Sequence, residues 1–401
     1  MNGSFKHTLK ACYLGYITQA IINNLAPLLF VTFQKQFQVS VEQLGLLISM
    51  NFFIQMVVDV LAARYVEQLG YRACLVVAHF LCVVGLAGLN FFPIWLPWPV
   101  VGLALAMGIN AVGGGLIEVL VSPLVEALPG EQKASAMSML HSFYCWGHMA
   151  VVLASTLYFN LFGLENWNYL PLLWALVPLA NAFLFGRVPI RTLSEDGAGL
   201  SLSRLLSLRL FWLFFVLMIC SGAAEQAMSQ WSSLFAETGL GVSKTLGDLL
   251  GTCTFALLMG ASRLFYGKKG SQIPLQTYLF VSASLCVGAY LLAVFAPWPL
   301  LSLVGCGFCG FSVGIMWPGV FSMASLYIPM GGTAMFGLLA LAGDVGCSAG
   351  PGLVGMISGL ADGELKAGLL ASVIFPLLLV LLVPGLGRNK KMDGTDIKMK
   401  S

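Results

Sequence analysis

Four acidic residues lie inside long apolar stretches of this sequence: Asp59, Glu118, Glu225 and Asp344. Glu225 is near the middle of the segment VLMICSGAAEQAMSQWSSLF (216–235), and no Lys or Arg lies within fifteen residues on either side of it. If such a segment crosses a bilayer, a charged side chain in it is costly, and acids in that position are functional candidates by default. These residues are therefore candidates for binding a proton or a solute.

A histidine lies at the depth of one of these acids. Glu118 lies about ten residues before the end of its apolar segment, and His141 lies about seven residues after the start of the next one. At about 1.5 Å per helical residue, we expect the two side chains at similar depth on neighbouring helices. A carboxylate beside an imidazole stabilises the charged form of each and can exchange a proton near neutral pH. The alternative is a neutral His141 bonded to a backbone carbonyl. Asp344 is a second candidate for proton coupling, with a role in gating as its alternative.

Amide and aromatic side chains accompany these acids. Asn23 and Glu225 are 202 residues apart, the spacing at which the two parts of the chain repeat, so Asn23-Asn24 and Glu225-Gln226 are expected to face one cavity. Amides and carboxylates can bind hydroxyl groups, and aromatic rings can stack on the apolar faces of sugar rings. The predicted substrate-binding residues are Asn23, Asn24, Glu225, Gln226, Trp146, Trp231 and Trp317. Helix–helix hydrogen bonding is the alternative for the two Asn residues, and a protonated structural acid is the alternative for Glu225.

The composition excludes most other classes of protein. Of the 401 residues, 58% are apolar and 9% are charged, and the mean hydropathy is +0.89. A soluble domain is about 25% charged. The ten Cys residues are scattered in apolar surroundings, which predicts small buried side chains and neither disulfides nor a metal site. No nucleophile–base pair, cofactor motif or phosphate-binding loop is found, so we expect neither an enzyme nor a nucleic-acid-binding protein.

Twelve segments are long enough to cross a membrane as helices, which takes about 20 apolar residues each. The sequence predicts an all-α integral membrane protein with spans at 9–33, 41–65, 73–94, 98–125, 134–162, 168–186, 209–236, 243–265, 273–295, 298–326, 332–360 and 365–386. The predicted units are a six-helix bundle (1–186), a linker (187–208), a second six-helix bundle (209–388) and a tail (389–401). If both termini are cytoplasmic, 17 of the 20 Lys and Arg residues lie on that side, and the exceptions are Lys35, Lys244 and Lys366. We therefore expect a multi-pass protein of the cell membrane, in lipid and monomeric.

The two halves resemble each other. Segments ending at Gly45 and Gly247 match at an offset of 202, and Ala136-Met137 matches Ala334-Met335 at an offset of 198. Such duplication is common in transporters and predicts pseudo-symmetric halves.

Two six-helix halves joined by a linker resemble the major facilitator superfamily. The segment ARYVEQLGYR (63–72) is similar to that family's loop between spans 2 and 3, G-x-x-x-D-R-x-G-R-R, with Ala63 and Glu67 as departures. GASRLFYGKKG (260–270) is a looser counterpart between spans 8 and 9. The resemblance implies a cytoplasmic gate, to which we assign Arg64, Glu67 and Arg72, with Asp59 one turn above them.

A narrower resemblance covers Gly113–Met149. Its Gly-rich run, Glu118 and Pro-containing loop are similar to the fucose permease branch of sugar:H⁺ symporters, which implies that Glu118 is that branch's essential glutamate. Asn23 and Asn24 match the N-N-L-N-D stretch of that branch. Pro27 stands where the branch has a protonatable Asp, and Ala26 stands where it has the preceding Asn. The pattern G-x-x-E-x-x-x-S-x-W (222–231) resembles the related "bypass of stop codon" permeases.

The sequence thus predicts H⁺-coupled uptake of a neutral sugar or related polyhydroxy solute by alternating access. No Lys or Arg lies in the core of any predicted span, which disfavours anionic solutes. The main alternative is a multidrug or organic-cation antiporter driven by H⁺. Such antiporters carry G-x-x-x-G-P in span 5, whereas here this pattern lies at 346–351 in span 11. A membrane receptor is a third alternative, disfavoured because the longest loop has only about twenty residues.

Overall fold

The computed structural model describes residues 3–128, 133–190, 200, 202–269, 273–328 and 331–386. All regular elements in these ranges are helical, and twelve helical segments are long and apolar enough to cross a membrane. The predicted all-α membrane fold with twelve spans is confirmed.

The first six spans are built from α1 (Gly3–Asn24) with η1 (Ala26–Leu29) and α2 (Phe30–Phe37), then α3 (Val41–Leu69), α4 (Tyr71–Trp95), α5 (Pro99–Ala127), α6 (Lys133–Phe162) and α7 (Tyr169–Arg187). The last six are built from α9 (Arg209–Leu234) with η3 (Phe235–Gly239), α10 (Lys244–Gly247) with η4 (Asp248–Cys253) and α11 (Thr254–Lys269), α12 (Leu275–Phe295), α13 (Pro299–Val313) with α14 (Met316–Tyr327), α15 (Gly332–Leu360), and α16 (Leu365–Ala371) with α17 (Ile374–Leu382) and η6 (Val383–Gly385). The short helix α8 (Leu202–Leu206) precedes α9.

Local sequence sets several of these boundaries. Ser40 starts α3 with a capping box, in which its hydroxyl accepts from the Gln43 amide and the Gln43 side chain accepts from the Ser40 amide. Pro99 and Pro299 stand in the first turn of α5 and α13, where a missing N–H costs nothing. Gly70, between α3 and α4, has a φ of 85°, which favours glycine.

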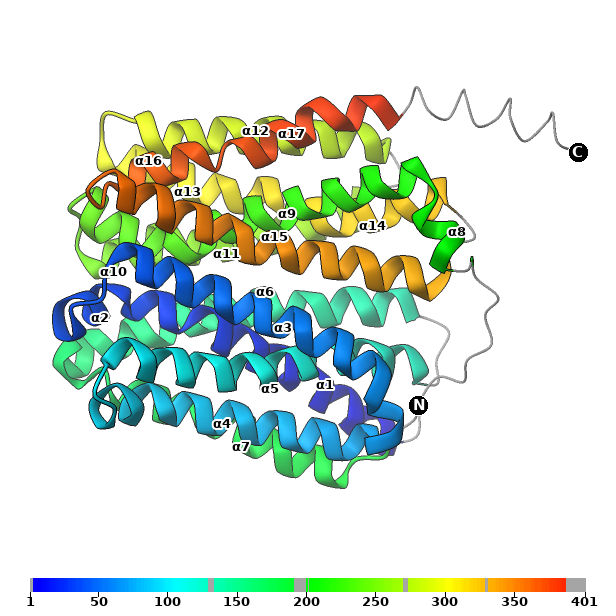
Figure 1. The fold of residues 1–401 in the computed structure, drawn as a ribbon, viewed down its shortest axis with the longest axis horizontal. Coiled ribbons are helices and arrows are strands. Elements are labelled where there is room, and N and C mark those ends of the chain that lie inside the picture. The colour runs from blue at the N-terminus through cyan, green and yellow to red at the C-terminus, as the bar shows by residue number, and fades with distance from the viewer. Residues whose placement is uncertain are drawn as a thin grey trace, which may run out of the picture.

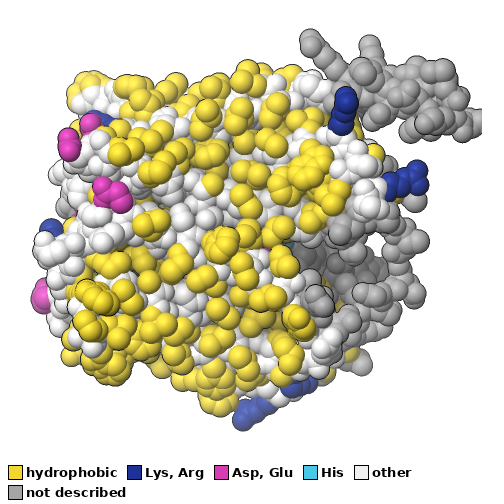
Figure 2. Space-filling model, viewed as in Figure 1, with side chains coloured by type: hydrophobic (Ala, Val, Ile, Leu, Met, Phe, Trp, Pro, Cys, Tyr) yellow, Lys and Arg dark blue, Asp and Glu magenta, His cyan; other side chains and the backbone are white. Residues whose placement is uncertain are grey.

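The helices form two groups that lie one above the other in Figure 1. We call α1–α7 the N half and α9–η6 the C half. The start of α1 and the end of η6 lie at the right of the view, which we call the terminal end, and the opposite side is the distal end (Figure 1). In Figure 2 the middle of the visible face is mainly hydrophobic, acidic side chains lie at the distal end, and most Lys and Arg lie toward the terminal end. This distribution fits a protein that crosses a membrane along its long axis.

Glycines bring α15 against a helix of each half. A methyl group on Gly346 or Gly350 would overlap the α9 backbone at Ile219 and Ala223, so the α9–α15 contact requires glycine at both positions. Across the halves, the Cα of Gly355 lies in the space that a side chain on Gly45 of α3 would need. These close approaches place the middle of α15 beside both α3 and α9.

Polar contacts close the distal end between the halves. The Ser49 and Ser348 hydroxyls each donate to the other's carbonyl oxygen at 2.9 Å. The Lys244 ammonium group donates to the Leu28 carbonyl at 2.6 Å, and the Thr245 hydroxyl donates to the Asn160 side chain at 3.1 Å. These bonds join α1–η1, α3 and α6 of the N half to α10 and α15 of the C half.

Candidate functional site

A polar cavity lies between the two halves, about midway along the spans. Residues from eight helices line it: Tyr16, Gln19 and Asn23 of α1, Phe52 of α3, Glu118 of α5, His141 and Tyr144 of α6, Glu225 and Gln226 of α9, Arg263 of α11, Trp317 of α14, and Asp344 and Cys347 of α15. Four of these helices belong to each half. The cavity holds about 100 Å³ of space, less than the roughly 300 Å³ of a typical small-molecule pocket. A solute as large as a sugar therefore requires the lining side chains or the halves to move.

Glu118 begins a chain of hydrogen bonds through the N half. The Gln19 amide donates to the Glu118 carboxyl at 2.7 Å and to the Gln55 side-chain oxygen at 2.8 Å. The Gln55 amide then donates to the side-chain oxygen of Asn23 at 3.0 Å, and the Asn51 amide reaches the same oxygen at 3.3 Å. A carboxyl in the cavity is thus connected through the side chains of Gln19, Gln55 and Asn23 to the end of α1, in the middle of the first span.

The chain of hydrogen bonds continues into the C half. The Gln230 amide donates to the backbone carbonyl of Asn23 at 3.1 Å and to the Gln226 side-chain oxygen at 3.0 Å. The Gln226 amide approaches the Glu225 carboxyl at 3.4 Å, and the other Glu225 oxygen is 3.9 Å from the Arg263 guanidinium. Polar side chains, together with the Asn23 backbone carbonyl, therefore connect Glu118 in one half to Glu225 in the other.

Arg263 corrects the expectation that no basic residue lies in the core of a span. The loop motif 260–270 included it and the predicted span (243–265) ended two residues after it, but α11 continues to Lys269, so Arg263 is nearly two turns inside the helix. Its guanidinium lines the cavity and pairs with Glu225. Because a cation is present, the argument against anionic solutes no longer holds.

His141 and Glu118 both line the cavity, as their predicted depths require. The Glu118 carboxyl is bonded to Gln19, while the His141 ring stands edge-on to Tyr16 at 5.3 Å between centroids. Tyr16 in turn shares a hydrogen bond of 2.8 Å with Ser122 of α5. The two predicted partners are thus in one cavity, and the described contacts of each are with other residues.

The predicted substrate-binding residues divide between the cavity and other places. Asn23, Glu225, Gln226 and Trp317 line the cavity. Asn24 is not among the lining residues, and its side-chain amide donates to the Ala20 carbonyl at 2.9 Å and to the hydroxyl of the lining residue Tyr144 at 3.4 Å.

Two of the three predicted tryptophans lie outside the cavity. Trp146 is 41% exposed on the outer face of α6 and packs on Phe143. Trp231 is fully buried toward the distal end, where its indole N–H donates to the Pro351 carbonyl at 3.1 Å. The repeat register alone does not show which face of α6 Trp146 occupies, because a shift of one residue turns a side chain by about 100° around the helix axis.

The predicted gate residues are also separated. The carboxyl groups of Asp59 on α3 and Asp344 on α15 interact across the interface between these helices. Arg72 donates to the carbonyl groups of Phe185 and Gly186 at 2.8 Å each, which caps the end of α7 within the N half. The side chains of Arg64 and Glu67 lie outside the described residues.

Sequence reasoning missed the cavity residues Tyr16, Gln19, Tyr144 and Arg263, and it missed Gln55, which is hydrogen-bonded to Gln19 and Asn23. Tyr16, Gln19 and Asn23 are three and four residues apart, a spacing that puts them on one face of α1. That periodicity was available in the sequence. The hydrogen bond between Gln19 and Gln55 was not, because it depends on how α1 packs on α3.

Comparisons with known proteins agree with this architecture. The profile of the Major Facilitator Superfamily matches residues 12–351. A bacterial homolog of the human lysosomal transporter Spinster, in an inward-facing and occupied conformation, has a TM-score of 0.75 at 14% identity, with 97% of this chain and 98% of that chain covered. A variant of the E. coli fucose:proton symporter has a TM-score of 0.65 at 18% identity, with 95% and 98% covered. No curated protein sequence matches the chain.

Proposed function

Because the chain belongs to the major facilitator superfamily of transporters, we propose that it moves a small polyhydroxy solute together with H⁺ by alternating access of its two halves. The observation that carries this proposal is the chain of hydrogen bonds from Glu118 to Glu225, which spans both halves in the cavity between them. One of the structural neighbours is a fucose:proton symporter, and this similarity supports the proposal of a polyhydroxy solute moved together with H⁺.

Glu118 is the proposed proton carrier. It lines the cavity with a hydrogen bond from a neutral amide, and the described cation of the cavity, Arg263, pairs with Glu225 instead. A carboxylate buried without a counter-ion is costly, so proton binding at Glu118 stabilises the closed cavity. The Asp59–Asp344 contact supports a second proton site, because two adjoining carboxyl groups repel when both are charged.

The amides and Trp317 are the proposed solute contacts. Asn23 and Gln226 present donors and acceptors to the cavity, and Trp317 provides an aromatic face. This combination suits a solute with hydroxyl groups on one side and an apolar ring face on the other.

The proposed orientation has the terminal end in the cytoplasm. Lys and Arg gather toward this end, and cytoplasmic loops carry such an excess. In this orientation the described contacts close the extracellular side, and the solute leaves the cavity toward the cytoplasm.

Transport by the purified protein in proteoliposomes tests the proposal. A panel of labelled hexoses, pentoses, polyols and sugar acids is offered under an inward proton gradient, with protein-free liposomes and a protonophore as controls. We expect saturable uptake of at least one solute that the protonophore abolishes. If no solute of the panel moves, but a proton gradient drives efflux of lipophilic cations, the protein is an antiporter and the proposal is wrong.

A further inference from the structure

The Arg263 guanidinium has few good acceptors for its N–H groups. Its Nε donates to the Gly314 carbonyl at 3.1 Å, and Nη1 donates to the Cys145 sulfur at 3.2 Å. Nη2 is 3.9 Å from both the Met259 sulfur and the Glu225 carboxyl. A guanidinium carries five N–H donors, and a well-formed pair with a carboxylate has N–O distances of about 2.7–2.9 Å. One oxygen acceptor lies within hydrogen-bonding distance here.

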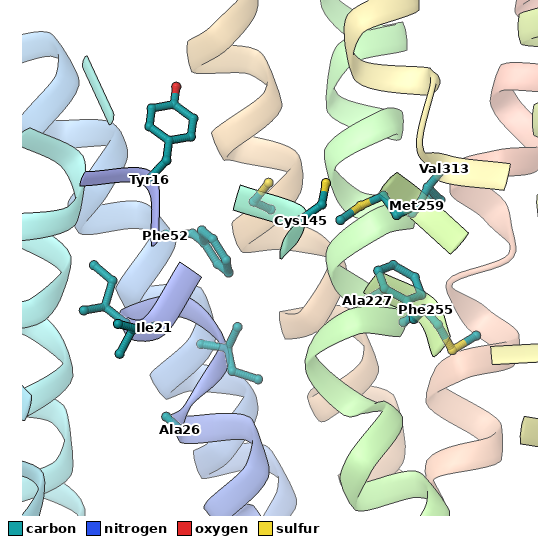
Figure 3. Close-up of a cluster of buried hydrophobic side chains, with 14 of the residues drawn as sticks. Tyr16, Ile21, Ala26, Phe52, Cys145, Ala227, Phe255, Met259 and Val313 are labelled. Atoms are coloured by element: carbon teal, nitrogen blue, oxygen red, sulfur yellow. The ribbon is translucent and has the colours of Figure 1, made fainter. Parts of the chain in front are cut away.

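The fold holds this guanidinium in place by one edge. Helix α13 ends at Val313 and α14 begins at Met316, and the Gly314 carbonyl between them accepts from Nε. Figure 3 shows Cys145 of the N half and Met259 of the C half pointing toward each other close to Val313, so the sulfur atoms lie where the halves meet. The guanidinium is therefore oriented by backbone and thiol contacts and does not depend on a close ion pair.

The free donors face the cavity. The Arg263 side chain is 18% exposed, and it lines the same cavity as Asn23, Gln226 and Trp317. Thioether and thiol sulfurs are weak acceptors, and a buried charge without strong partners is costly. A cavity that keeps an under-bonded guanidinium is complementary to a ligand that brings acceptor oxygens.

We propose that Arg263 binds a carboxylate group of the transported solute, so that the solute is a sugar acid or similar polyhydroxy monocarboxylate. This inference rests on the proposed function and names its substrate class. The amides of Asn23 and Gln226 bind the hydroxyl groups, and the planar guanidinium donates side-on to the oxygens of the carboxylate. A monoanion is favoured over a phosphate ester, because Glu118, Glu225 and Asp344 surround the cavity and repel a second negative charge.

Pairs of solutes that differ in one group test this proposal. Glucose and glucuronate, or galactose and galacturonate, share a ring and differ by a carboxylate. We would measure their binding to the purified protein as ligand-induced shifts in melting temperature, and their power to inhibit uptake in proteoliposomes. A charge-assisted pair of this kind is expected to give the acid about tenfold or greater preference over the neutral sugar.

Two Arg263 variants and a matched control test whether the charge of Arg263 causes the preference for the acid. Arg263→Gln is expected to bring the preference close to one, and Arg263→Lys to keep part of it, because an ammonium keeps the charge and loses the bidentate geometry. Arg209→Gln makes the same change at an exposed position at the start of α9 and is expected to leave the preference unchanged.

The outcomes distinguish this inference from the proposed function. If the wild-type protein binds or moves a neutral sugar and the matching acid does not compete, the inference is overturned and the proposed function stands. If no polyhydroxy solute binds or moves, both are overturned. The wild-type preference decides the inference even if Arg263→Gln does not fold.

Discussion

Lys244 holds the two halves together at the distal end, and its removal should loosen them there. Its ammonium group donates to the Leu28 carbonyl across the halves at 2.6 Å. Within the C half it pairs with Glu237 at 3.2 Å and with the fully buried Asp248 at 3.1 Å. Asp248 also accepts from the Thr156 hydroxyl of the N half at 3.4 Å. Lys244→Met removes the cation and keeps an apolar chain of similar length.

These contacts affect two separate free energies, that of opening the halves at the distal end and that of unfolding. The bond to Leu28 exists only while the halves are closed at this end, and a hydrogen bond to a charged group contributes about 1.5–3 kcal/mol. Its loss should raise the population opened at the distal end by about 10- to 150-fold. The pairs with Glu237 and Asp248 lie within the C half, so they persist in both states. Their loss lowers the melting temperature instead, because the buried carboxylate of Asp248 is left without a cation beside it.

Hydrogen–deuterium exchange measures the opening without labels. In the variant, we expect amides of η1 and α2 (26–37) to exchange about tenfold faster or more than in the wild type, while α4 and α12 change little. Lys35→Met removes an exposed cation of the same segment and serves as the control. Thr245→Val removes a neutral bond to Asn160 and should have a smaller effect, about fivefold for 1 kcal/mol.

One result would refute this reasoning. If Lys244→Met lowers the melting temperature and exchange at 26–37 stays at the wild-type rate, Lys244 stabilises the C half and does not hold the halves together. A uniform rise in exchange over all helices would lead to the same conclusion.

Further predictions concern the cavity and the helix contacts. Trp317→Leu should reduce solute affinity severalfold in an uptake assay, because Trp317 lines the cavity, while Trp146→Leu on the exposed face should leave it unchanged; equal effects would contradict this placement. Gly346→Ala should destabilise the protein by about 1–3 kcal/mol, because the added methyl group meets the Ile219 carbonyl of α9. Gly337→Ala on the same helix meets open space and should not lower the melting temperature; a drop as large as that of Gly346→Ala would argue against the packing explanation.

The sequence was sufficient for the fold because a bilayer-spanning helix is a local property. Apolar length, turn-forming residues and the distribution of Lys and Arg are each read within about 30 residues. The twelve predicted spans match those of the structure within a few residues, and α11 continues as a helix four residues beyond its predicted span end at 265. Arg263, which the sequence placed in a loop motif at the edge of a predicted span, therefore lies inside the helix and lines the cavity.

The site was less predictable because it depends on helix rotation and on contacts between distant segments. Glu118, Glu225 and Asp344 were found because an acid in an apolar segment stands out in any register. Trp146 was misplaced because an aromatic residue in an apolar helix packs well on either face. Asp248 was left without a role because it lies near a span end, yet it is fully buried and bonded to Ser233 at 2.6 Å. Here the chain is wound as the π-helix η4, whose wider turn the sequence pattern does not indicate.

The most direct test of the central claim is the transport mode of Glu118→Gln. The amide keeps the size of the side chain and can still contact Gln19, but it cannot carry a proton. In proteoliposomes loaded with the solute found in the uptake panel, we expect the variant to exchange labelled for unlabelled solute at a rate near that of the wild type. Accumulation of the solute under an inward proton gradient should be lost. If Glu118→Gln accumulates solute against its gradient as the wild type does, Glu118 is not the proton carrier and the proposed coupling is wrong.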